Sequence, residues 1–229
     1  RYSAECERDV ELAKSMGYSG EVMTVVPNAG GISDEDLSIK RLPVSERQTI
    51  AIKGYDNWVG RARVALHALE KISRKFTDWR VVVFSANRSV IKLSKKISKR
   101  SGLKIETYGK GKLTRQEVLE ILAQSRIYIG ISESDGVSTT LLEAMAMEAL
   151  PVQTNTACCD EWFGDSGVTI TEISPESIQR AIEKAMVMSK NPKYVQKNRI
   201  TVQSRASSAR IQNTVLSFYD LKEKYPKES

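Results

Sequence analysis

The sequence predicts an α/β fold: a Rossmann-like, doubly wound parallel sheet with helices on both faces. Short runs such as Trp79–Phe84 and Ile127–Ile131 are mostly apolar and rich in Val and Ile, as strands covered on both faces are. Helical stripes alternate with these runs at about 20 to 30 residues per unit, which is typical of a parallel sheet. Crossovers in such sheets are right-handed, so the carboxyl ends of the strands open toward one edge, where ligands bind.

The first part of the chain is predicted to hold one helix and one strand. A helix is expected over residues 5–16, and Glu21–Val26 reads as a strand closed by Pro27 and Asn28. The chain starts inside an amphipathic stretch, which suggests a piece of a longer protein. We therefore expect residues 1–20 to be an N-terminal helix that links to an absent lobe, and residues 21–229 to be the domain itself.

The remaining elements follow from apolar spacing. Helices are expected over 58–73, where Ala65, Leu69 and Ile72 share one face, and over 89–100, where Val90, Leu93 and Ile97 point inward. Further helices are expected over 115–124, after the 134–138 loop to about 148, around the stripe Ile178–Met186, and in the tail to about Tyr219. The predicted strands are Thr49–Ile52, Trp79–Phe84, 103–107, Ile127–Ile131, Leu150–Thr154 and Val168–Ile170.

Composition excludes several classes of protein. With 41% hydrophobic and 28% charged residues, the chain resembles an ordinary soluble globular protein, and no apolar run approaches the roughly 20 residues needed to span a bilayer. Its three cysteines form no disulfide framework, and adjacent Cys158 and Cys159 lack a zinc spacing. We expect a cytoplasmic protein without a metal site.

The net charge of +7 is concentrated in one segment. Nine basic residues lie between Lys92 and Arg115, with Glu106 as the only acid. Such a cluster attracts phosphate groups, anionic lipid headgroups or nucleic acid. The alternative is a solvated helix face.

The segment 134–154, SDGVSTTLLEAMAMEALPVQT, has the features of an anion site. A glycine loop that leads into a helix presents free backbone N–H groups at a positive helix end, where a phosphate or diphosphate binds. Asp135 lies ahead of that end and could accept hydrogen bonds from sugar hydroxyls. Glu143 could take two bonds from a ribose. The alternative is that Thr140 and Glu143 form a capping box.

This segment resembles the acidic-x7-acidic motif of retaining glycosyltransferases with the GT-B architecture, of the family 4 type (glycosyl transferases group 1). The motif usually reads E-G-x-x-x-x-x-L-E-A-M-A. The segments VVPNAGGI at 25–32, IAIKGY at 50–55, SRIYIGIS at 125–132 and DEWFGDSG at 160–167 also resemble that family, in the same order.

The resemblance implies the C-terminal, donor-binding domain of such an enzyme. The donor substrate would be a nucleotide-diphosphate sugar, UDP- or GDP-linked, and the acceptor a glycan or lipid-linked sugar held by an absent N-terminal lobe. No cofactor or metal is implied. Asp135 and Glu143 would be the catalytic pair, on the donor sugar and the ribose, and Lys110 would lie near the base. The other donor-binding residues would be Gly54, Gly136, Val137, Ser138, Thr139 and Thr140.

Three positions depart from the family pattern. Asp135 replaces the usual Glu, and Glu148 replaces a common glycine. Tyr55 and Val59 stand where the family carries an Arg and a Lys on the donor phosphates. Arg61 is the candidate substitute, and its alternative is a surface arginine. Trp58 could close over the pocket, although packing is the favoured interpretation.

Two other functions are considered. The chain could be a non-catalytic module that binds a nucleotide sugar, or a nucleic-acid-binding domain that uses the basic 92–115 segment. The second ranks last, because the segment carries one aromatic residue, Tyr108, among nine basic ones and no familiar nucleic-acid-binding motif, and we expect no nucleic-acid partner. Because many sugar acceptors are lipid-linked, the basic segment could also bring the protein to an anionic membrane.

Overall fold

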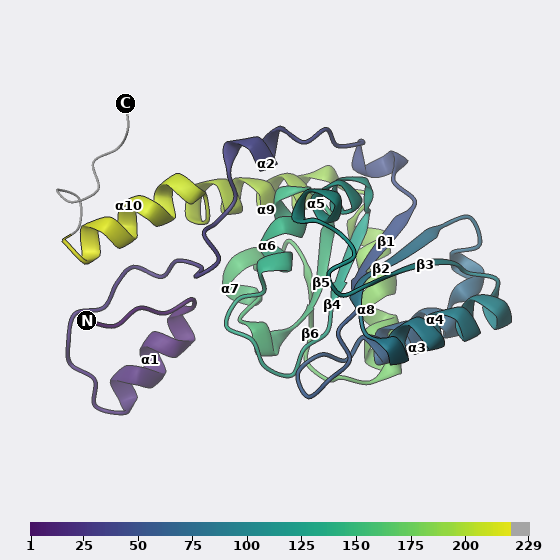
Figure 1. Cartoon of the computed structure of the whole chain (residues 1–229), viewed down its shortest axis with the longest axis horizontal. Helices are drawn as coiled ribbons and strands as arrows, with labels where there is room; N and C mark the ends of the chain where they lie inside the picture. Colours follow the sequence, from purple (N-terminus) through teal and green to yellow (C-terminus); the bar gives the residue numbers. More distant parts are fainter. Residues whose placement is uncertain (221–229) are drawn as a thin grey trace.

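The computed structural model describes residues 1–220 and contains a six-stranded sheet in the order β3-β2-β1-β4-β5-β6 (Figure 1). Every pair of neighbouring strands is parallel, which confirms the predicted fold class. The strands are β1 Thr49–Lys53, β2 Arg80–Ala86, β3 Lys104–Gly109, β4 Ile127–Gly130, β5 Leu150–Thr154 and β6 Val168–Ile170.

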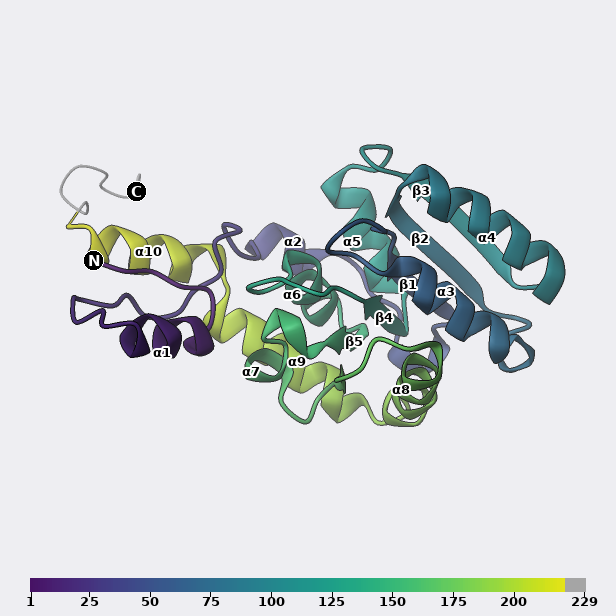
Figure 2. The same cartoon turned by 90° about the horizontal axis from the view of Figure 1, so that it is seen from below.

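Helices cover both faces of the sheet (Figures 1 and 2). One face packs against α3 (Ala62–Lys71), α4 (Arg88–Ser101) and α8 (Pro175–Met188). The other packs against α5 (Arg115–Gln124), α6 (Thr139–Ala146), α7 (Asp160–Phe163) and α9 (Pro192–Arg205). Two apolar layers result, one on each side of the sheet.

Local signals in the sequence set the ends of these helices. Asn87 caps α4 by accepting a hydrogen bond from the Val90 N–H, and Gly102 ends α4 at a φ of 75°; glycine favours this left-handed conformation. Ser174 caps α8, which begins at Pro175. These ends lie close to the predicted ones, because capping residues specify helix ends locally.

The order of strands reverses between β1 and β4. The chain runs outward from β1 to β2 and β3, then crosses back to place β4 on the other side of β1. The two crossover connections diverge at this point and leave a crevice at the carboxyl ends of β1 and β4. The fold therefore places its natural ligand site beside Lys53 and Gly130.

The predicted strand Glu21–Val26 is wrong. This segment makes one bridge, between Tyr2 and Val22, and belongs to no strand. Its apolar side chains are buried elsewhere. Val25 packs with Ala4 and with Val10 of α1 (Glu7–Ser15), and Met23 and Val26 pack with α10 (Ser208–Phe218). The alternating pattern reflects burial between helices rather than pairing in a sheet.

Two short helices were not predicted. They are α2 (Asp34–Ser38), which precedes β1, and α7, which follows β5. Helices of five and four residues contain too little periodicity to be recognised by apolar spacing. The helix α2 begins with a capping box between Ser33 and Asp36, which is the one signal that could have revealed it.

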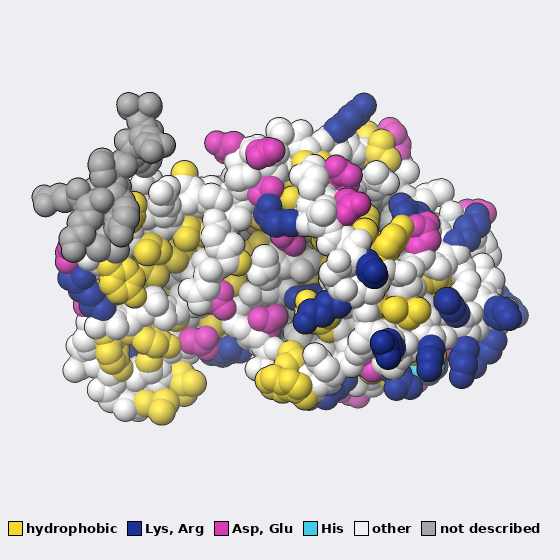
Figure 3. Space-filling view, viewed as in Figure 1, with side chains coloured by type: hydrophobic (Ala, Val, Ile, Leu, Met, Phe, Trp, Pro, Cys, Tyr) yellow, Lys and Arg dark blue, Asp and Glu magenta, His cyan; other side chains and the backbone are white. Residues whose placement is uncertain are grey.

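The lysines of α4 lie on its solvent face. Lys92, Lys95, Lys96 and Lys99 are exposed, while Val90 and Ile97 of the same helix are buried. Figure 3 shows Lys and Arg side chains gathered at the end of the molecule that contains α4, at the right of the view. Within residues 1–220, none of the helices combines the length and the apolar character that crossing a bilayer requires.

Candidate functional site

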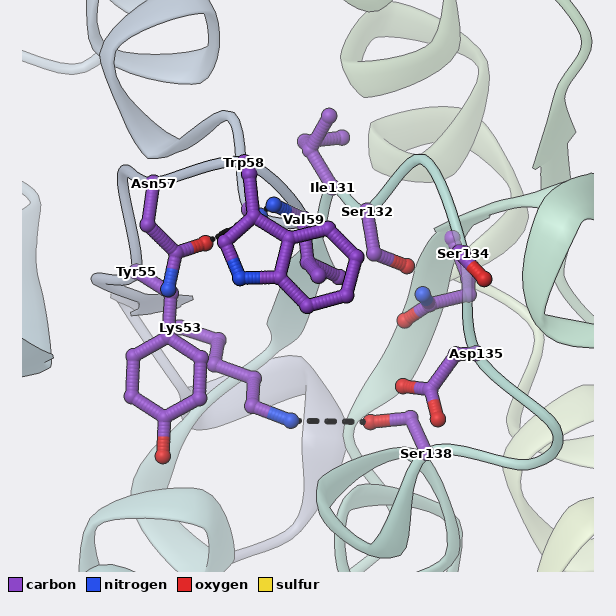
Figure 4. Close-up of a pocket in the computed structure, with 13 residues that line it drawn as sticks. Lys53, Tyr55, Asn57, Trp58, Val59, Ile131, Ser132, Ser134, Asp135 and Ser138 are labelled. Carbon is purple, nitrogen blue, oxygen red and sulfur yellow. Dashed lines mark hydrogen bonds between the residues drawn. The ribbon is translucent and has the colours of Figure 1, made fainter.

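A pocket of about 270 Å³ lies at the carboxyl ends of β1 and β4 (Figure 4). One wall is the loop that follows β1, from Tyr55 to Gly60, and the other is the loop that leads from β4 into α6. Of the predicted site residues, Asp135 and Ser138 line this pocket. Residues from two separate crossover connections thus meet at the predicted edge of the sheet.

The loop after β1 is fixed to the loop after β4 by backbone hydrogen bonds. The Arg61 N–H donates to the Ile131 carbonyl at 3.1 Å, and the Glu133 N–H donates to the Val59 carbonyl at 2.8 Å. The Asn57 side chain accepts bonds from the Val59 and Gly60 N–H groups. Hydrogen bonds within the chain therefore define the rim of the pocket.

Lys53 is a residue of the pocket that the sequence analysis did not predict. It is the last residue of β1 and lines the pocket, and its Nζ donates to the Ser138 Oγ at 3.3 Å. Burial lowers the pKa of Lys53, while the Asp135 and Glu143 carboxylates oppose that shift. A lysine that ends the apolar strand TIAIK, directly before Gly54, was the available signal.

The N-terminal end of α6, called its mouth below, faces this lysine. Ser138 is the N-cap residue, and within the described chain no side chain caps the helix. The capping-box alternative is wrong. It requires Thr140 to be the N-cap residue, whereas the N-cap residue is Ser138, two positions earlier, and the Glu143 carboxylate binds Arg115 rather than the backbone. The backbone N–H groups of the first turn, at Thr139 and Thr140, can therefore donate hydrogen bonds to an anion.

Glu143 is held by an arginine instead. Arg115 Nε donates to Glu143 Oε1 at 3.1 Å, and the other guanidinium nitrogens donate to Asp36 at 2.6 and 2.9 Å. Burial raises the pKa of Glu143, while Arg115 and Lys53 counteract that effect. The carboxylate is buried and is not part of the pocket lining.

Two predicted cations lie outside the pocket. Arg61 pairs with Glu133 at 2.7 Å and donates to the carbonyl groups of Asn57 and Gly60. Lys110 is exposed on the turn after β3, which is separated from β1 by β2. The structure does not bring either side chain to the lysine and the helix mouth.

Three further predicted site residues pack within the protein and do not line the pocket. Gly54 lies where β1 approaches β2: a Cβ there would be 2.8 Å from the Phe84 carbonyl oxygen. Val137 is buried in the apolar layer around α6. A Cβ on Gly136 would collide with the carboxylate of Glu5, which also accepts a bond from the Asn28 N–H at 2.9 Å. The N-terminal segment therefore covers the glycine of the predicted phosphate loop.

Trp58 stands at the opening of the pocket with 81% of its surface exposed. The interpretation of Trp58 as a packing residue is therefore wrong. In Figure 4 its ring lies across the space between Tyr55 and Ser132. An indole in this position offers an aromatic surface to a bound ligand.

Cys6, Cys158 and Glu161 form the one cluster in the described part of the chain that has three potential metal ligands close together. The two sulfur atoms are 2.9 Å apart and both thiols are buried. Burial raises the pKa of each thiol. The Glu161 carboxylate already accepts bonds from the Glu7 and Arg8 N–H groups and so caps α1. The predicted lack of a metal site stays a prediction.

Structural comparison shows the same fold in several solved glycosyltransferases. A glycosyltransferase from Rickettsia africae matches with a TM-score of 0.71 at 15% identity, over 96% of this chain and 62% of that one. WaaG, a glycosyltransferase involved in lipopolysaccharide biosynthesis, matches with a TM-score of 0.65 at 16% identity, over 88% of this chain and 57% of that one. Anabaena HepE, solved with UDP and glucose, matches with a TM-score of 0.68 at 12% identity, over 95% of this chain and 62% of that one. The chain thus spans about three fifths of the length of these proteins.

Sequence comparison gives the family. No curated protein sequence matches the chain significantly. The family model described as "Glycosyl transferases group 1" matches residues 34–202, which is more than half of the chain and includes the pocket, α6 and the Arg115 contact. Together with the fold, one Rossmann-like lobe of the GT-B type, this match shows that the chain belongs to the glycosyl transferases group 1 family.

Proposed function

We propose that this chain is the donor-binding half of a retaining glycosyltransferase of the family 4 type, which moves a sugar from a UDP- or GDP-sugar to a glycan or lipid-linked acceptor. The observation that carries the proposal is the convergence of Lys53, Ser138 and the open mouth of α6 at one pocket. The acceptor would be held by an N-terminal lobe outside this chain. We place the enzyme in the cytoplasm, with peripheral membrane contact through the basic face of α4.

The pocket separates hydrogen-bond donors from acceptors. Lys53 and the first N–H groups of α6 are donors that suit the diphosphate. Asp135 is an acceptor that suits the hydroxyl groups of the sugar. Arg115 contacts one oxygen of Glu143, and we assign the other oxygen to the ribose. Lys53 takes the role that we had expected for Arg61.

This arrangement favours departure of the nucleoside diphosphate. Negative charge develops on the phosphates as the glycosidic bond to the leaving group breaks. A lysine and a helix N-terminus that are fixed before the reaction stabilise that charge more in the transition state than in the ground state. Retention of the anomeric configuration is assigned from the family resemblance.

Isothermal titration calorimetry with UDP, GDP and a short oligonucleotide tests the proposal. Saturable binding of one nucleoside diphosphate at one site per chain is the expected result. Oligonucleotide binding with a steep salt dependence, and no nucleotide binding, would instead support the nucleic-acid alternative. Turnover of a nucleotide sugar by a protein that also carries an acceptor lobe would distinguish an enzyme from a non-catalytic module.

Glu5→Gln is expected to strengthen the binding of the nucleoside diphosphate several-fold. The Glu5 carboxylate lies against Gly136 at the loop proposed to receive the diphosphate, and removing its charge lowers the repulsion between two anions. The amide keeps an oxygen for the Asn28 N–H. Glu11→Gln, an exposed change on α1, is the control, and equal affinity in both variants would contradict the prediction.

A further inference from the structure

The floor of the pocket is polar, although the strands that build it are mostly apolar. Gly130 of β4 and Gln153 of β5 line the pocket and are paired neighbours in the sheet. Ile52 is paired with Ile129, so Lys53, Gly130 and Gln153 form a row across three adjacent strands. Tyr128 lies two residues before Gly130 and hence on the same face of the sheet.

The space in front of Gly130 is occupied by two polar groups. A Cβ on Gly130 would lie 2.5 Å from the Tyr128 hydroxyl and would collide with the side-chain oxygen of Gln153. Any larger residue at this position would displace both groups. The glycine therefore allows the hydroxyl and the amide to converge at the floor of the pocket.

Neither the Tyr128 hydroxyl nor the Gln153 oxygen makes a hydrogen bond of normal geometry within the part of the chain that the structure describes, although Ser138 lies near the hydroxyl. Tyr128 is 0% exposed and Gln153 is 1% exposed. A buried polar group without a partner costs about 1–3 kcal/mol, and native proteins rarely leave one unsatisfied. Here two such groups lie together in front of Gly130, and Gly130 and Gln153 line the pocket.

The chemistry of the pair indicates its partner. The Gln153 oxygen is an acceptor, as is the Asp135 carboxylate in the same pocket, and neither attracts the oxygens of a phosphate. Burial raises the pKa of Tyr128, so its hydroxyl stays protonated and can donate. A group that both donates and accepts, such as a sugar hydroxyl, satisfies the two together.

We propose that Gln153, positioned beside the Tyr128 hydroxyl, is a specificity-determining residue that binds a hydroxyl group of the transferred sugar. The diphosphate lies over Lys53 and the mouth of α6, and the sugar ring extends along the row of strands toward Gln153. The Tyr128 hydroxyl donates to the same sugar hydroxyl from below. This inference rests on the proposed function and adds to it the group that discriminates between sugars.

Gln153→Met and Tyr128→Phe test the assignment, because each removes an unpartnered polar group at nearly constant volume. The stability of the ligand-free chain is expected to stay the same or to rise, since an unsatisfied buried group is lost. Gln203→Met and Tyr219→Phe, at exposed positions, are the matched controls. Calorimetry would compare UDP and GDP with UDP-glucose, UDP-galactose, UDP-N-acetylglucosamine and GDP-mannose.

The wild-type chain is expected to prefer one sugar over its epimer, and Gln153→Met should reduce that preference about tenfold, the equivalent of one hydrogen bond. Tyr128→Phe should reduce it less. The affinity for the free nucleoside diphosphate should change less than about twofold in both variants, because the phosphates bind elsewhere.

Three results would overturn the assignment: an unchanged sugar preference in both variants, a wild-type chain that binds all the sugars equally, or a clear loss of ligand-free stability. In each case binding of UDP or GDP would still support the proposed function. A wild-type chain that binds neither nucleotide would overturn the proposed function, and this inference with it.

Discussion

Lys53→Met is expected to weaken the binding of a nucleoside diphosphate by about 10- to 150-fold, the equivalent of about 1.5–3 kcal/mol for a charged hydrogen bond. Lys53 is the lysine of the pocket lining, and its Nζ already contacts the residue that caps α6. The departures from the family pattern make this residue decisive. Tyr55 and Val59 stand where two cations are usual, and Arg61 is paired with Glu133.

Binding by calorimetry at several pH values gives this prediction two independent readouts. As the pH rises, Lys53 loses its proton and its attraction for the diphosphate. Because burial lowers the pKa of Lys53, the wild-type affinity should fall at a lower pH than it would with a lysine of ordinary pKa. The variant should show no such fall. Methionine keeps most of the side-chain length and removes a partly buried charge, so the variant is expected to fold.

Lys112→Met is the matched control. Lys112 belongs to the basic 92–115 segment but is exposed on the turn after β3. If general positive charge drew the nucleotide to the protein, both variants would lose affinity to a similar degree. Equal losses would contradict the role of Lys53 and would favour a diffuse basic surface.

The sheet could be predicted because each strand is a short run of mostly apolar residues. Burial on both faces of the sheet requires such runs, as in TIAIK, WRVVVF and IYIGI. The order of strands was open, since it depends on crossovers that no local run specifies. The segment EVMTVV shows the limit of the method, because burial between α1 and α10 produces the same apolar pattern as a strand.

The site was predicted less completely than the fold. The glycine loop and the helix mouth were recognised because they are contiguous in sequence. Lys53 and Gln153 were missed because each is a polar residue near the end of a mostly apolar strand, and only pairing between strands brings them together. The contact between Glu5 and Gly136 joins segments more than a hundred residues apart. Patterns within a short stretch of sequence cannot predict contacts between distant segments.

Arg47→Met is expected to lower the free energy of unfolding by about 3–5 kcal/mol, the largest effect on stability that we predict. Arg47 is 1% exposed. Its guanidinium donates to the carbonyl oxygens of Leu42, Ser125, Met147 and Glu148 at 2.7 to 3.0 Å. Methionine would leave these acceptors without a donor in the protein interior. Burial lowers the pKa of Arg47 to about 10, so the side chain remains charged at neutral pH.

The positions of these carbonyl groups connect the arginine to the site. Ser125 follows α5, and Met147 and Glu148 follow α6, so Arg47 binds the negative end of the helix whose positive end opens into the pocket. Lysine cannot replace it, because a single ammonium group does not reproduce the fork of donors. Urea unfolding of Arg47→Met and Arg47→Lys, with exposed Arg180→Met as the control, measures the effect. Midpoints that match wild type would show that α6 holds its orientation without this contact.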